Sequence, residues 1–166
     1  SLNNYLPPEF LQHLEASIAR AQSENSVGTL LLVSIANMPM LVSTCGSEIS
    51  EVVIQDLTES IRRIIKSQDK IFRLQRDQLA VVLMNVYPQD TRSIAERILA
   101  MVENYGRDRF TTAAVHVIAS IGSAHFPSGA MKAQELAHQA YLALYAAPAT
   151  AFRTFSEVRD DTEKAR

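Results

Sequence analysis

The chain has 166 residues, of which 47% are apolar and 20% are charged, as expected of one globular domain with a sizeable core. A formal net charge of −2 provides no basic field, which argues against nucleic acid as a partner. The single cysteine, Cys45, excludes an internal disulfide and a cysteine-based zinc site, and its apolar neighbours predict that it is packed. No apolar run is long enough to span a bilayer, so we expect no membrane contact by this domain. The free thiol and the lack of a visible signal peptide predict a cytoplasmic location, with a membrane anchor left open elsewhere in the full-length protein.

Hydrophobic periodicity divides the chain into helices and strands. In chain order the expected elements are a helix at 7–22, a strand at 27–36, a short helix at 37–46, a helix at 47–67, two strands within 73–84, a helix at 89–106, a strand at 111–127, a helix at 130–147 and a strand at 151–155. Ser47 is the expected N-cap of its helix. Gly46 and Gly106 are expected to end helices, and Gly122 to interrupt the long strand.

This order predicts an α/β (α+β) fold in which helices flank a central mixed sheet and a β-hairpin lies in the middle of the chain. Residues 1–155 are expected to form a single domain, and the polar tail 156–166 to be a linker to a further domain. Because the chain starts at Ser1 without a methionine, we expect it to be part of a larger protein.

The order and several local phrases resemble one family. The phrases are "LLLVSIANM", "SQDKIFRLQRDQLAVVL", "IAERI", "ASIGSAHFP" and "AYLALYAA". They make the chain, from about Pro7 to Phe155, similar to the GGDEF domain of diguanylate cyclases, which join two GTP molecules into cyclic di-GMP. The resemblance implies a GGDEF-type five-stranded sheet whose hairpin carries the family's signature.

The resemblance also implies metal-assisted phosphoryl transfer, in which two magnesium ions require carboxylate ligands. The five signature positions here are Gln75, Arg76, Asp77, Gln78 and Leu79. Asp77 matches the metal-binding third position, whereas Gln78 replaces an acid, and Ser34 and Ala36 stand where acids usually end the first strand. With one carboxylate left, we expect no catalytic residue, no metal and no cofactor, and Asp77 also fits an ordinary turn-forming acid. Magnesium and GTP would be cofactors only of an enzyme.

Other positions depart from the family's nucleotide contacts. Gln75 and Arg76 put side chains where the two family glycines let the nucleotide approach, although a phosphate-binding role for Arg76 stays open beside a solvated one. Pro39 has no N–H to offer to the phosphate cradle. Pro148 and Phe152 stand at the positions of two cations that clamp the phosphates.

Glu51 matches the acid that pairs with guanine, and it also fits a first-turn helix acid, whereas Val42 replaces the guanine-reading asparagine. The family's inhibitory product site, Arg-x-x-Asp, corresponds to Lys66 through Asp69, with Arg97 near a secondary arginine position. The alternative for Lys66 and Asp69 is a helix C-terminus followed by a polar stop.

The predicted function is a non-catalytic GGDEF-like regulatory or dimerisation module of a bacterial cyclic di-GMP signalling protein. The expected partners are a neighbouring domain of the same chain, with an EAL phosphodiesterase domain as the candidate, and a second copy. Two alternatives stay open: a sensor that binds GTP or cyclic di-GMP without turnover, and a low-activity cyclase that uses Asp77.

Overall fold

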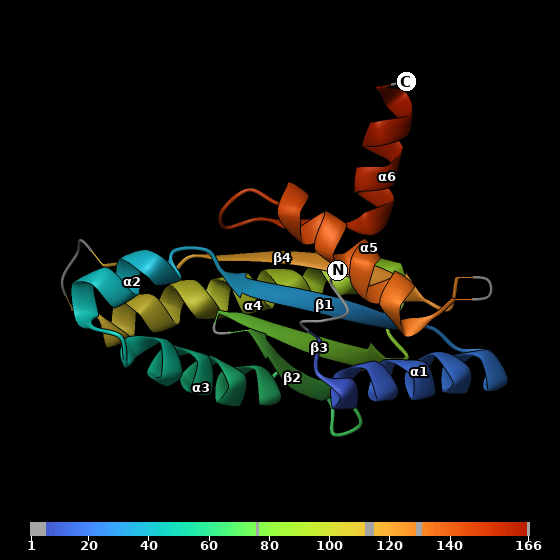
Figure 1. Cartoon of the computed structure of the whole chain (residues 1–166), viewed down its shortest axis with the longest axis horizontal. Helices are drawn as coiled ribbons and strands as arrows, with labels where there is room; N and C mark the ends of the chain where they lie inside the picture. Colours follow the sequence, from blue (N-terminus) through green and yellow to red (C-terminus); the bar gives the residue numbers. More distant parts are fainter. Residues whose placement is uncertain (1–5, 76, 112–114, 129–130, 166) are drawn as a thin grey trace.

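The computed structural model describes residues 6–75, 77–111, 115–128 and 131–165. Its elements are α1 (Pro8–Ser23), β1 (Gly28–Ile35), α2 (Met38–Cys45), α3 (Ile49–Arg62), β2 (Lys70–Gln75), β3 (Gln78–Met84), α4 (Pro88–Arg109), β4 (Ala119–Phe126), α5 (Ala133–Ala146), β5 (Phe152–Thr154) and α6 (Phe155–Lys164) (Figure 1). The predicted order of helices and strands is therefore present, with α6 added after it.

The strands form one sheet in the order β2-β3-β1-β4-β5. β1 is central and antiparallel to both β3 and β4, whereas β5 adds parallel to β4. The predicted five-stranded mixed sheet with flanking helices is confirmed. The register that aligns β1 with β3 brings the end of β1 beside the tip of the β2–β3 hairpin.

Helices cover both faces of the sheet. Leu30 and Leu32 of β1 pack into a core with α1 and α5, whereas Leu31 and Val33 pack into a second core with α2, α3 and α4. Because successive side chains of a strand point to opposite faces, a central strand covered on both faces must be apolar throughout. This explains the continuous apolar run of β1. No helix in the described ranges is long and apolar enough to cross a bilayer.

Several predicted boundaries are wrong. Ser47 is not the N-cap of α3, because the chain is already helical in conformation at Glu48, which occupies that position without a side-chain cap. The helix ends at Arg62 rather than near Ser67. Gly106 lies inside α4, where an added Cβ would come within 2.9 Å of the backbone nitrogen of Val117, so this glycine permits close packing rather than ending the helix.

Of the predicted long strand at 111–127, residues 112–114 lie outside the described residues, and residues 115–118 are not a strand. β4 begins only at Ala119, because the backbone N–H of Ile118 donates to the Asn37 side chain, 2.9 Å away, instead of to a neighbouring strand. Gly122 does not interrupt β4, since it pairs in register with Leu32. Cys45, expected to be packed, is exposed.

The tail expected to be only a polar linker contains α6, which projects away from the sheet (Figure 1). The Thr154 side chain accepts a hydrogen bond from the Glu157 backbone N–H, which caps the helix. The Glu157 carboxylate also pairs with Arg92 of α4 and with Arg153 of β5. Arg153 contacts Asp161 at 2.5 Å as well, so α6 is held to the domain by ion pairs. A linker role for this segment stays a prediction.

Candidate functional site

The hairpin tip and the end of the central strand form one cluster, as the signature predicts. Gln75 and Gln78 face each other across the hairpin, and Ser34 of β1 is in register with Gln78. The backbone carbonyl of Asp77 accepts a hydrogen bond from the N–H of Ile35, 2.9 Å away. Arg76 lies outside the described residues.

The side chain of Gln78 faces the protein interior. Its Oε1 atom accepts a hydrogen bond from the hydroxyl of Tyr141 on α5, 2.9 Å away. Gln78 is 8% exposed and Tyr141 is 1% exposed. Burial, together with Tyr145 and Asp77, raises the pKa of Tyr141 to about 12, so that its hydroxyl remains a donor at neutral pH. The bond ties the signature hairpin to α5.

The turn after β1 is closed by the side chain of Asn37. Its Nδ2 donates to the carbonyl of His116 at 2.7 Å, and its Oδ1 accepts from the N–H of Ile118. The N–H of Ala36 donates to the carbonyl of Ile118 at 2.7 Å. Pro39 lies in the first turn of α2, as predicted. This turn therefore uses its polar groups to hold the segment that leads into β4.

Glu51, in the first turn of α3, is paired with Arg73 of β2. The guanidinium donates to both carboxylate oxygens at 2.7 Å, a bidentate geometry that is among the stronger forms of ion pair. The bond to Glu51 raises the pKa of Arg73. Glu51 is thus positioned by β2 as well as by the helix dipole.

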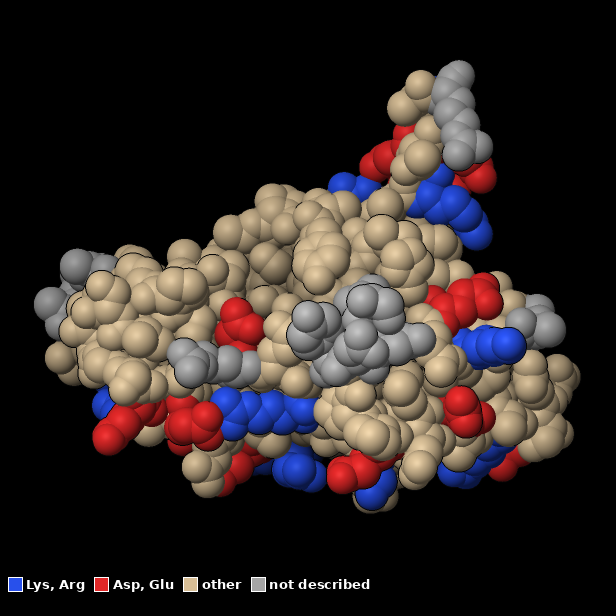
Figure 2. All heavy atoms as spheres, in the orientation of Figure 1, with Lys and Arg blue, Asp and Glu red and all other residues tan. Residues whose placement is uncertain are grey.

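The two predicted clamp positions offer no cation. Phe152 is 6% exposed and belongs to the core beneath α3 and α4. The guanidinium of Arg92 lies 5.0 Å from the centre of its ring. The carbonyl of Pro148 accepts a hydrogen bond from Ser120, 3.2 Å away. On the face shown in Figure 2, charged side chains are sparse over α2 and α5 and frequent along α1, α3 and α6.

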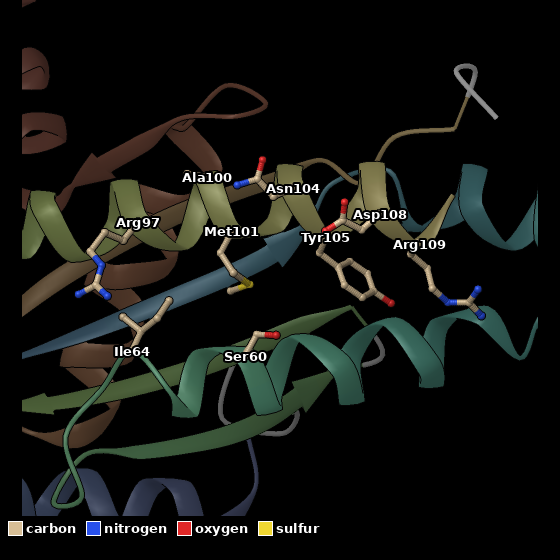
Figure 3. Close-up of a pocket in the computed structure, with 9 residues that line it drawn as sticks. All are labelled: Ser60, Ile64, Arg97, Ala100, Met101, Asn104, Tyr105, Asp108 and Arg109. Atoms are coloured by element: carbon tan, nitrogen blue, oxygen red, sulfur yellow. The ribbon is translucent and has the colours of Figure 1, made fainter. Parts of the chain in front are cut away.

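The three positions that correspond to the inhibitory site, Lys66, Asp69 and Arg97, have different surroundings in the structure. Both oxygens of Asp69 accept backbone hydrogen bonds, from Lys66 at 2.9 Å and from Met84 at 3.0 Å, and the residue is 8% exposed. Lys66 is exposed. Arg97 lines a groove of about 680 Å³ between α3 and α4, together with Ile64 and Met101 (Figure 3).

We predict that Asp69→Ala lowers the free energy of unfolding by about 2–4 kcal/mol, because two backbone donors lose their acceptor and the Met84 N–H is buried. Urea denaturation followed by circular dichroism measures the change. Asp160→Ala, on the exposed face of α6, is the matched control and should change the value by less than about 0.5 kcal/mol. Equal values for the two variants would contradict the role of Asp69.

Sequence reasoning missed the side-chain contacts of three residues that shape the site: Tyr141, Asn37 and Arg73. Their partners lie 63, 79 and 22 residues away in the chain, so no local pattern identifies them. The available signal was Tyr141 at an inward-facing position of its helix, between Ala137 and Leu144, since a buried hydroxyl requires a partner. Within the described ranges, no three His, Cys, Asp or Glu side chains are close enough together to hold a metal ion.

Comparison with known proteins places this arrangement in context. The family model described as "Diguanylate cyclase, GGDEF domain" matches residues 8–153. The diguanylate cyclase DgcS of Shewanella oneidensis is 28% identical over 145 residues, which cover 85% of this chain and 46% of the relative. The bifunctional diguanylate cyclase/cyclic di-GMP phosphodiesterase MucR of Pseudomonas aeruginosa is 25% identical over 133 residues, 80% of this chain and 19% of the relative. The chain thus spans less than half of each relative.

Solved structures share the fold. The GGDEF domain of TpbB (YfiN) from Pseudomonas aeruginosa superposes with a TM-score of 0.80 at 21% identity, covering 100% of this chain and 98% of that one. The active GGEEF domain of a diguanylate cyclase from Vibrio cholerae gives a TM-score of 0.80 at 17% identity, with 89% and 94% covered.

Proposed function

The chain belongs to the GGDEF domain family of diguanylate cyclases, and we propose that it is a non-catalytic member that regulates a protein of cyclic di-GMP signalling. The observation that carries the proposal is the set of side chains around the hairpin tip. Asp77 is the one acid at the tip in the described residues, beside the Ser34 hydroxyl and a Gln78 amide already bonded to Tyr141.

This donor set does not fit a two-magnesium centre. Magnesium is bound through carboxylates and phosphates, and hydroxyl and amide oxygens do not supply the missing charge. Glu51, the acid at the guanine-binding position, accepts a hydrogen bond from Arg73 at each of its two carboxylate oxygens. Since Phe152 packs in the core and Pro148 is uncharged, two phosphate-binding cations are absent from these positions as well.

The test is isothermal titration with GTP in magnesium, followed by an assay for cyclic di-GMP. We expect neither GTP binding below about millimolar concentration nor product formation. Transfer of the triphosphate from water into the site costs free energy, and no cations at these positions offset that cost. DgcS of Shewanella oneidensis is the positive control. Product formed at a rate comparable with that of the control would refute the proposal.

A sensor that binds cyclic di-GMP without turnover is the second candidate. The groove beside Arg97 supports it, because it pairs a guanidinium with an apolar floor (Figure 3). Arg97→Ala is the variant that tests it. Cyclic di-GMP binding that is lost in this variant would favour the sensor over a module that acts only through contacts.

We further propose that the module acts on a neighbouring domain of the same protein, with an EAL phosphodiesterase as the candidate, or on a second copy, in the cytoplasm. MucR, a relative named as both cyclase and phosphodiesterase, supports such an arrangement. Sedimentation equilibrium of the chain alone tests whether it dimerises, since a dimer would have twice the mass of the monomer.

A further inference from the structure

One edge of the sheet carries an open groove. β2 is the last strand on its side and pairs only with β3 among the described strands. An edge strand presents a row of backbone N–H and C=O groups to any chain that can align with it. Beside this edge lies a groove of about 620 Å³. It is lined by the N-terminal half of α1, by Arg62 at the end of α3, and by the four consecutive β2 residues 70–73.

The groove has an excess of positive charge. Arg62 and Lys70 are exposed and make no ion pair with any described residue. Glu9 is the single acid among the lining residues. Arg73 is paired with Glu51, which lies with Glu59 in a second groove on the α3 side of the strand, and Arg62 borders both grooves. The α1 side of the edge therefore attracts anionic groups.

A buried polar atom lies in the same groove. The Nε2 atom of His13 is inaccessible to solvent and has no hydrogen-bond partner among the described residues. Its ring lies 5.3 Å from that of Phe72, which also lines the groove. Burial and the charge of Lys70 lower the pKa of His13, so the ring is neutral at pH 7. Because Nε2 is inaccessible, the ring contributes an aromatic surface beside Phe72 rather than a donor to a ligand.

From these observations we propose that the groove along β2 binds an extended acidic peptide segment, which adds to the sheet as a further strand. Backbone pairing with β2 would supply affinity, and acidic side chains at alternate positions would meet Lys70 on the α1 face of the strand. The apolar side chains between them would point to the other face, beside Ile71. A second copy fits less well, because two copies of this edge would each bring the same basic residues, Lys70 and Arg62, to the contact.

The experiment uses the isotope-labelled chain and follows its backbone amide signals by NMR. The probe is a short peptide of alternating Glu and Val with blocked ends. We expect saturable shifts that are largest in β2 residues 70–73 and at His13, together with slower amide exchange in β2. A peptide of alternating Lys and Val, and the acidic peptide with every valine replaced by proline, should bind at least about tenfold more weakly, because one lacks the charge and the other the backbone donors.

Charge reversal distinguishes peptide binding in this groove from a general electrostatic attraction to the protein surface. Lys70→Glu should weaken the acidic peptide by about five- to tenfold and strengthen the basic one, whereas Lys132→Glu, an equal change at the exposed start of α5, should alter both by less than about twofold. Circular dichroism checks that both variants are folded.

Other outcomes overturn the proposal. Inorganic phosphate that shifts the same amides as strongly as the peptide would assign the groove to a small anion. Self-association lost in Lys70→Glu would assign the edge to a second copy. The absence of shifts at millimolar acidic peptide, or equal binding of the acidic and basic peptides, would remove the site altogether.

Discussion

Restoring the signature alone, through Gln75→Gly, Arg76→Gly and Gln78→Glu, is expected to leave turnover of GTP undetectable. The substitutions return two glycines and one acid to the hairpin. They do not add charge at Ser34, free Glu51 from Arg73, or return an N–H at Pro39. Turnover stays undetectable because the phosphate and metal contacts outside the hairpin are still missing.

The expected size of this effect follows from the number of contacts. Each charge-assisted contact to a phosphate or metal contributes about 1.5–3 kcal/mol, although such contributions need not add. Since about 1.4 kcal/mol changes a rate tenfold, three missing contacts lower catalysis by at least about a thousandfold. Production of cyclic di-GMP by the triple variant, measured beside DgcS, would show that the contacts outside the hairpin are dispensable.

Denaturant unfolding of the triple variant is the control for folding. Gln78→Glu keeps an oxygen that can accept from the Tyr141 hydroxyl, but it buries a carboxylate, and the two glycines free the unfolded chain, so the triple variant should stay folded and unfold at a lower denaturant concentration than the parent chain. Adding Ser34→Asp and Pro148→Lys then tests the cluster further. Phe152→Arg cannot be added without cost, because it would place a guanidinium in a core position.

Gly122→Val is expected to prevent folding or to lower the free energy of unfolding by more than about 4 kcal/mol, the range that marks a broken core. A Cβ atom at this position would lie 2.2 Å from the backbone nitrogen of Leu144 and 2.6 Å from the carbonyl oxygen of Ala140. Both atoms belong to the backbone of α5, so no side-chain rotation relieves the overlap. The helix would have to move away from the sheet and leave its buried face unpacked.

Gly46→Ala is the matched control for Gly122→Val. Nothing lies within 4 Å of a Cβ at Gly46, but its φ of 96° is a conformation that alanine adopts only under strain. We expect a loss of about 1–3 kcal/mol there. Soluble yield, circular dichroism and urea denaturation separate the two variants. A Gly122→Val protein as stable as Gly46→Ala would show that α5 can shift away from β4 at little cost.

Hydrophobic periodicity was sufficient to predict the sheet and the order of its elements, because burial on one or both faces determines which positions must be apolar. The apolar run of β1 and the amphipathic spacing of α3 are the clearest examples. Glycine was a poorer guide. Gly106 and Gly122 were interpreted as local breaks, whereas the structure uses both to bring a second element close to the backbone.

The site was predictable only in part. The alignment of Ser34 with the hairpin tip followed from the resemblance, and the register confirms it. The partners of Gln78 and Glu51 depend on which elements meet in space, so they could not be identified from neighbours in the chain. The tail did contain a local signal, because Thr154 and Glu157 have the spacing of a helix-capping box.

The two arginine contacts of Glu157 have a mechanical consequence. One arginine belongs to the start of α4 and the other to β5, so α6 is braced at its first turn from two directions. A force that tilts α6 cannot be absorbed by bending at Thr154 alone, because tilting stretches both ion pairs. The load passes instead into α4, the helix that also borders the groove at Arg97, and into the edge of the sheet at β5.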